Sequence, residues 1–93
     1  MGVGDPWSAG ASIPAGGYVV FQPATGVTVL VLYIYNTDTT YVKFYYTDGT
    51  TDTYIDNLGT GQYRFTMINT KYLKVVNTAT AAKTVGVHGM CLS

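Results

Sequence analysis

The sequence predicts an all-β domain, an antiparallel β-sandwich or jelly-roll-like barrel of about seven short strands. Runs rich in Val, Tyr, Phe and Thr recur at intervals of roughly 10 residues, as expected of short strands. Clusters of Gly, Pro, Asn and Asp separate these runs and are typical of turns. Glu is absent from the 93 residues, which argues against helices. We therefore expect one β-domain over residues 12–93, preceded by an irregular arm over residues 1–11.

The expected arm, MGVGDPWSAGA, differs in composition from the rest of the chain. Small residues, Gly and Pro dominate it and it shows no hydrophobic period, which indicates irregular structure. Its one large residue is Trp7, which follows Pro6. A large aromatic side chain in a tail needs a place to dock, either on its own domain or in a pocket of a neighbour. Pro6 and Trp7 are therefore candidate interface residues.

The β-domain begins with a short strand that Pro23 ends, and each later strand is bounded by a turn. The turns include Pro23–Gly26, where Pro fixes φ and Gly accepts a positive φ, and Asn69-Thr70. We expect the strands over residues 18–22, 27–35, 41–47, 50–56, 62–68, 72–77 and 84–92.

The most apolar strand spans residues 27–35, and both of its faces are apolar. Side chains alternate between the faces of a strand. A sandwich strand normally has one buried and one solvated face. We therefore expect another part of the chain, or another copy of it, to cover the second face. The two expected faces are Val27, Val29, Val31, Tyr33 and Tyr35, and Thr28, Leu30, Leu32 and Ile34.

Asp48-Gly49 lies between two alternating runs and predicts a two-residue type I′ hairpin turn. This turn would pair Thr47 with Thr50 and Tyr46 with Thr51. The outward face of such a hairpin combines aromatic rings, hydrogen-bonding groups and a few charges, which favours a recognition surface. Its members are Tyr41, Lys43, Tyr45, Asp52, Tyr54 and Asp56.

The composition excludes several classes of partner. Five basic residues balance five acidic ones, so no net field attracts nucleic acid or an anionic membrane. The longest apolar run is less than half of the ~20 residues needed to cross a bilayer, and no basic-then-apolar leader is present. Cys91 is the only cysteine, so no disulfide framework holds the fold. We expect a protein made in a reducing cytoplasm, without a signal peptide or a transmembrane segment.

The sequence offers no catalytic, cofactor or metal site. His88 is the only histidine, and Cys91, three residues later on the same strand, would lie on the opposite face. Asp48, Asp52 and Asp56 could suggest a Ca²⁺ site. However, residues four apart on a strand are ~13 Å apart, too far to share one ion. We therefore expect no enzyme activity, no cofactor and no metal.

Carbohydrate binding is the alternative function. Sugar-binding sandwiches offer aromatic rings for stacking and carboxylates that accept hydrogen bonds from hydroxyl groups. The residues that would serve are Tyr41, Tyr45, Asp52, Tyr54 and Asp56. The same outward tyrosines could instead stabilise the strand pair or be covered by another protein.

The arrangement ASIPAGGYVVFQPATGVTVLVLYI over residues 11–34, an Asp-Gly hairpin, NTKYLKVVN over 69–77 and VGVHG over 85–89 resembles the small all-β accessory proteins of tailed bacteriophage and similar virions. These are the head decoration or cement proteins. The resemblance implies a virion protein that forms homo-oligomers, with a trimer favoured, and that clamps a larger capsid protein. The chain lacks an obvious long, charged capsid-anchoring tail. Its contact residues would be Pro6, Trp7, Tyr33, Tyr41, Tyr45 and Tyr54; a receptor-binding tail or fibre component is the alternative.

Overall fold

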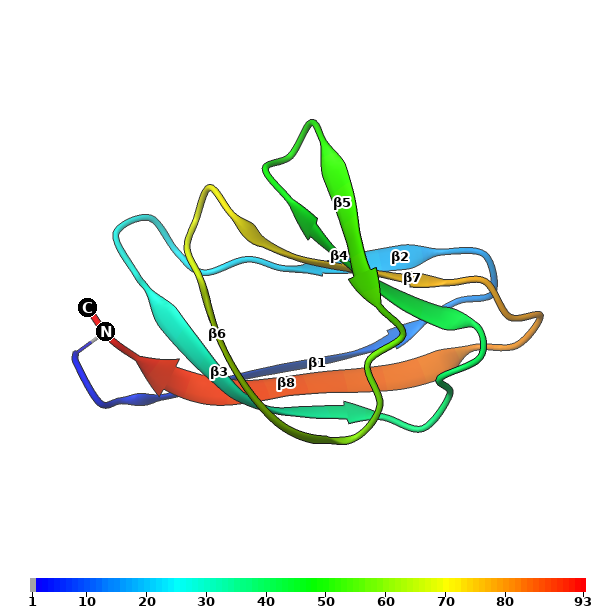
Figure 1. The fold of residues 1–93 in the computed structure, drawn as a ribbon, viewed down its shortest axis with the longest axis horizontal. Helices are drawn as coiled ribbons and strands as arrows, with labels where there is room; N and C mark the ends of the chain where they lie inside the picture. The colour runs from blue at the N-terminus through cyan, green and yellow to red at the C-terminus, as the bar shows by residue number, and fades with distance from the viewer. Residues whose placement is uncertain (1) are drawn as a thin grey trace.

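A computed structural model describes residues 2–93 of the chain as two packed antiparallel sheets. Sheet A has the strand order β1-β8-β3-β6, and sheet B has the order β2-β7-β4-β5. The two sheets form the lower and upper layers of Figure 1. The strands are β1 (Pro6–Ile13), β2 (Tyr18–Phe21), β3 (Val29–Asn36), β4 (Val42–Thr47), β5 (Asp52–Asp56), β6 (Gly61–Met67), β7 (Tyr72–Asn77) and β8 (Lys83–Cys91). The prediction of an antiparallel β-sandwich is confirmed.

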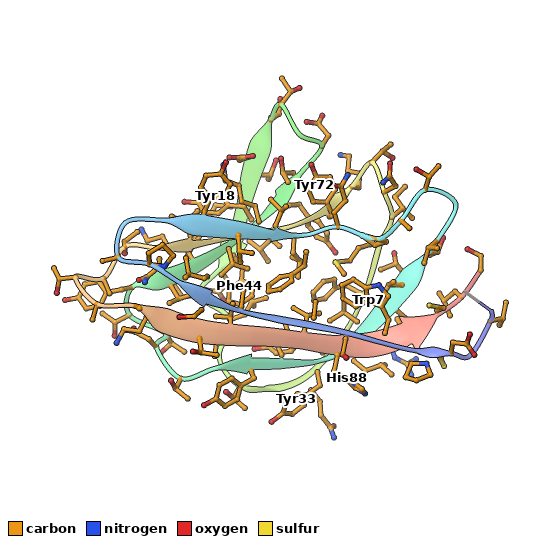
Figure 2. All side chains as sticks on the ribbon, turned by 180° about the vertical axis from the view of Figure 1, so that it is seen from behind. Trp7, Tyr18, Tyr33, Phe44, Tyr72 and His88 are labelled. Atoms are coloured by element: carbon orange, nitrogen blue, oxygen red, sulfur yellow. The ribbon has the colours of Figure 1, made fainter. Side chains whose placement is uncertain are left out.

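The core lies between the two sheets and is formed by alternate residues of each strand. Phe44 at its centre is fully buried, and Figure 2 shows its ring between the layers. Each large apolar side chain buried in this way stabilises the fold by about 1.5–3 kcal/mol relative to exposure. The buried apolar residues are Ile13, Phe21, Val27, Val29, Val31, Ile34, Val42, Phe44, Met67, Tyr72, Leu73, Val75, Val85, Val87 and Cys91.

The expectation of an irregular arm over residues 1–11 is wrong from residue 6 onward. Residues 6–13 form β1, which pairs with β8 along its whole length, from Pro6 opposite Met90 to Ile13 opposite Lys83. Alternate residues of β1 are half-buried against the core, Trp7 among them. Backbone pairing with β8 makes this segment a strand, although its small side chains have little strand preference.

The most apolar strand, β3, changes its inward face at Leu32. Val29 and Val31 are buried, but so are Ile34 and Asn36, whereas Tyr33 is exposed. The register of β3 against both β8 and β6 shifts between Val31 and Tyr33. Such an irregularity re-aims the side chains that follow it. The predicted faces are therefore wrong after residue 31.

The close approach of β8 to β3 at this shift requires Gly89. A Cβ atom at Gly89 would lie 2.2 Å from the carbonyl oxygen of Leu30 and 3.0 Å from its carbonyl carbon. No other residue type can occupy the position without moving one of the two strands.

The β4–β5 hairpin forms, but with a longer loop than predicted. Thr47 pairs with Asp52 rather than with Thr50, so residues 48–51 form the loop. The carboxylate of Asp48 accepts hydrogen bonds from the N–H groups of Thr50 at 2.9 Å and Thr51 at 2.8 Å. Gly49 has a φ of 94°. The two-residue turn is therefore wrong, and the displacement of two residues leaves Tyr45, Asp52 and Tyr54 on one face.

Candidate interaction surface

The outer face of sheet B carries two of the five aromatic residues predicted as contacts, Tyr45 and Tyr54. Its side chains project away from the core from all four strands of the sheet. We call it the tyrosine face, and it comprises Tyr18, Val20, Lys43, Tyr45, Asp52, Tyr54 and Lys74, with the largely buried Tyr72 beside them.

The centre of the tyrosine face is a continuous cross-strand row. Val20 pairs with Lys74, Lys74 with Tyr45, and Tyr45 with Tyr54. The rings of Tyr45 and Tyr54 make an edge-to-face contact with centroids 5.4 Å apart. The hydroxyl of Tyr54 donates a hydrogen bond to the side-chain oxygen of Asn57. Ring packing and this hydrogen bond hold the two tyrosines in a fixed orientation.

The charged group of Lys74 contacts two residues outside this row, Asp52 of β5 and Tyr18 of β2. Its Nζ lies 2.8 Å from a carboxylate oxygen of Asp52 and 4.5 Å from the centroid of the Tyr18 ring. The hydrogen bond from Lys74 lowers the pKa of Asp52, with a further contribution from Thr47. The hydrogen bond to Asp52 raises the pKa of Lys74. Both groups are therefore charged at neutral pH, and the face has little net charge at this point.

A shallow hollow lies beside Lys74, with a volume of about 170 Å³. Its walls combine two aromatic rings with hydroxyl, carboxylate and ammonium groups. This mixture of stacking and hydrogen-bonding groups suits a polar ligand with an apolar face. The lining residues are Tyr18, Val20, Thr47, Gly49, Asp52, Tyr72 and Lys74.

The structure separates the residues predicted for the site. Tyr45, Asp52 and Tyr54 lie together on the tyrosine face. A register shift between Phe44 and Tyr45 pairs Asp56 with the buried Phe44, which takes Asp56 out of the row. Tyr41 precedes β4 and lines a different hollow with Asp38, Thr78–Ala81 and Lys83. Of the five residues predicted to bind sugar, three therefore share one surface and two, Tyr41 and Asp56, lie apart from it.

The other predicted contact residues belong to sheet A. Tyr33 projects from the outer face of this sheet, next to His88, as Figure 2 shows. Pro6 is exposed at the start of β1, whereas Trp7 turns inward and packs against the core of its own chain. Of the two docking places considered for Trp7, its own domain is the one observed.

The outer face of sheet A, which we call the second face, carries the cationic side chain of Arg64 on β6 and apolar or aromatic side chains on β3. Leu30 and Met90 pair on adjacent strands, as do Tyr33 with His88 and Tyr35 with Gly86. Tyr33 is 40% and Tyr35 46% exposed. The second face is therefore the face of β3 that this chain leaves uncovered. It exposes Tyr33 and Tyr35, whereas Val29 and Val31, which were predicted to share a face with them, are buried.

Sequence reasoning overlooked Tyr18, which is 63% exposed and is the most exposed tyrosine among residues 2–93. The signal was the alternation in β2, where Phe21 is buried and Tyr18 and Val20 are not. What the sequence did not give is the strand order that places β2 next to β7 and so brings Tyr18 to Lys74.

The described residues contain no group of three or more His, Cys, Asp or Glu side chains arranged to hold a metal ion. His88 is exposed on the second face, and Cys91 is buried on the inner side of the same strand. The three aspartates considered for Ca²⁺ have separate roles: Asp48 caps the hairpin loop, Asp52 pairs with Lys74, and Asp56 accepts the N–H of Asn57. Within residues 2–93 there is no helix of the length and apolarity required to span a membrane.

Comparison with known proteins gives no further guide to function. No family model matches the sequence, and neither a curated protein nor a solved structure is significantly similar to it.

Proposed function

We propose that this chain is a non-enzymatic structural protein of a virion, a capsid decoration or cement protein that associates with copies of itself and stabilises a capsid lattice. The observation that carries the proposal is that both outer faces of the sandwich expose tyrosine and aliphatic side chains, and that Lys74 and Asp52 on the tyrosine face neutralise each other. Large exposed apolar patches on a small domain mark surfaces that other proteins cover.

The two faces support a linking role because they point in opposite directions. The tyrosine face exposes Tyr18 at 63% and Tyr54 at 50%, and the second face exposes Tyr33 and Tyr35. A protein that clamps a lattice must contact at least two neighbours at once. This sandwich offers an exposed aromatic surface on each side.

The charge balance supports the same role. Five basic and five acidic residues leave no net charge at neutral pH. Two of the bases, Lys74 and Lys83, are already paired with Asp52 and Asp38. Copies of the chain therefore do not repel one another, which allows them to pack at high density on a shell.

Quantitative mass spectrometry of purified virus particles tests this proposal. We expect the chain to be present in many copies, in a fixed ratio to the major shell protein. A chain that is absent from purified particles, or present only in trace amounts, would refute the proposal.

A carbohydrate- or receptor-binding module, such as a tail or fibre component, is the second candidate. The hollow beside Lys74 favours it, since Tyr18 and Tyr72 offer rings and Asp52 offers hydrogen-bond acceptors. Titration with a panel of oligosaccharides tests it, with Tyr18→Ala as the site variant and Tyr33→Ala, on the second face, as the control. Saturable binding that only Tyr18→Ala abolishes would establish the module, and its absence across the panel would refute it.

A further inference from the structure

We propose that β1 is a self-pairing edge, through which two copies of the chain join their A sheets into one continuous eight-stranded sheet. The inference deepens the proposed function, because it names the contact through which copies of the chain associate. The backbone of β1 and its charge pattern carry the inference.

β1 is an outer strand of sheet A, with β8 on one side only. In an antiparallel ladder, alternate residues of an edge strand direct their N–H and C=O groups away from the neighbouring strand. Such a row of backbone groups is a template for another strand. β1 is eight residues long and keeps an unbroken register with β8, so its open side is regular.

The other three edges carry features that discourage pairing. β2 has only four residues and is followed by Pro23. β5 begins with Asp52 and ends with Asp56. β6 carries Arg64, and its register against β3 is irregular. Short edges, charges and irregularities are the ordinary protections of free strands.

β1 has none of these protections. Its sequence, PWSAGASI, contains no charged residue. The nearest charge in the chain is Asp5, which lies before the strand. Pro6, the one residue that cannot donate a backbone hydrogen bond, is at the first position. The N–H of Cys91 donates to the carbonyl oxygen of Asp5, so in the unbroken register the odd-numbered residues of β1 bond to β8. Ser8, Gly10 and Ser12 therefore direct their N–H and C=O groups to the open side, and all three are uncharged.

The occupant that fits this edge is a second copy in antiparallel orientation. A two-fold axis through Gly10 would pair all residues from Trp7 to Ile13 and would leave Pro6 and Asp5 outside the ladder. In this register Ser8 faces Ser12 of the second copy, and the two Gly10 residues face each other. Neither position adds charge or bulk, and Ser8, Gly10 and Ser12 are all exposed in the single chain.

This arrangement is an isologous dimer, because each copy contributes the same segment. It differs from the trimer that the resemblance to decoration proteins implies. One strand pair buries less surface than a permanent interface, so the dimer should dissociate on dilution.

Sedimentation equilibrium of the full chain, from about 1 µM to about 500 µM, is the first test, since small interfaces associate in this range. We expect a reversible monomer–dimer equilibrium. A monomer throughout the range would overturn the proposal and would leave the edge for a strand of a different protein.

Two double variants then test the register. Ser8→Lys with Ser12→Lys places like charges opposite each other twice, and should weaken the dimer about 10-fold or more. Ser8→Lys with Ser12→Asp places opposite charges together in the Gly10-centred register, and should restore the dimer to within about 3-fold of the wild type. Equal loss of dimer in both variants would overturn the antiparallel register.

A charge-matched control is available away from β1. Thr50→Lys with Thr80→Lys adds the same net charge at exposed loop positions, and should leave the dimer unchanged. Circular dichroism and the melting temperature show whether each variant is folded. A lost dimer in this control would overturn the assignment to β1. These results are independent of the particle composition, so the dimer and the proposed virion role can fail separately.

Discussion

The backbone of β8 at Gly89 lies so close to the carbonyl group of Leu30 in β3 that there is no room for a side chain at position 89. A Cβ atom at Gly89 would lie 2.2 Å from the Leu30 oxygen. The contact falls beside the point where the register of β3 shifts, which is the point that turns Tyr33 outward. The close approach of these two strands therefore lies directly before the residues of β3 that face outward as part of the second face.

Gly89→Ala should be strongly destabilising, because β3 and β8 must separate to admit the methyl group. We expect a loss of roughly 3 kcal/mol or more in the free energy of unfolding. Gly86→Ala on the same strand is the matched control, since its Cβ would meet no atom closer than 3.7 Å. Urea denaturation of both variants measures the difference. Similar losses in the two variants would contradict the close contact.

Asn77 ties the turn after β1 to the end of β7. Its fully buried amide donates hydrogen bonds to the carbonyl oxygens of Ile13 at 2.9 Å and Ala81 at 2.9 Å. Its side-chain oxygen accepts the N–H of Ala79. Asn77→Ala leaves these groups without their partner and should cost about 2–4 kcal/mol of unfolding free energy. A loss below about 1 kcal/mol in chemical denaturation would show that water replaces the amide.

Tyr46 connects the two sheets through its hydroxyl, which donates to the carbonyl oxygen of Thr66 at 3.1 Å, and its ring, which packs edge-to-face on Phe65. Tyr46→Phe keeps the ring and loses only the hydrogen bond, so it should cost about 0.5–1.5 kcal/mol in thermal or chemical unfolding. Tyr35→Phe, at an exposed position, serves as the control and should cost nothing measurable. Equal stability of wild type and Tyr46→Phe would contradict a structural role for this bond.

The same residue should be visible in alkaline titration. Burial raises the pKa of Tyr46 above its usual value of 10.0. Because the folded pKa is raised, the associated stability is present below pH 10 and is lost as the pH rises through the folded pKa. The tyrosinate absorbance of the wild type should include a late component that Tyr46→Phe removes. A titration curve of the same shape in both proteins would be the opposite result.

Acid should weaken the fold through three aspartates. Hydrogen bonds from Tyr41 N–H, Thr51 N–H and the Lys74 side chain are the largest causes that lower the pKa of Asp38, Asp48 and Asp52, respectively. Since their folded pKa values are lowered, the stability they contribute is present above the unfolded value of 3.8 and is lost as the pH falls through the folded values. The triple Asp→Asn variant should show a shallower decline in unfolding free energy below pH 4. An unchanged decline would place the acid sensitivity elsewhere.

Much of the fold could be predicted because alternation is a local property. The hydrophobic pattern identified β2 to β8 and the inward positions of Val42 and Phe44. β1 was overlooked because Ser, Ala and Gly carry little strand preference, so its order comes from pairing with β8. The hairpin loop differed because the Asp48 carboxylate binds the N–H groups of both Thr50 and Thr51, which stabilises four loop residues rather than two.

The candidate surface was harder to predict because it depends on strand order. Tyr45 and Tyr54 share a hairpin and could be placed together from the sequence. Tyr18 reaches the same face only because β2 lies next to β7, far from the hairpin in the chain. Asp56 does not lie on this face because the register of β4 and β5 shifts between Phe44 and Tyr45, and no residue type in the sequence indicates that shift. Tyr33, the predicted contact residue on β3, lies on the opposite side of the sandwich from Tyr45 and Tyr54.

The central claim is that both outer faces are covered when the chain is in its assembly. Oxidative footprinting of the tyrosines, in intact particles and in the isolated chain, tests this claim most directly. Tyr18 and Tyr54 on one face, and Tyr33 and Tyr35 on the other, should be oxidised in the isolated chain and protected in particles. Equal oxidation of all four tyrosines in the two samples would contradict the claim.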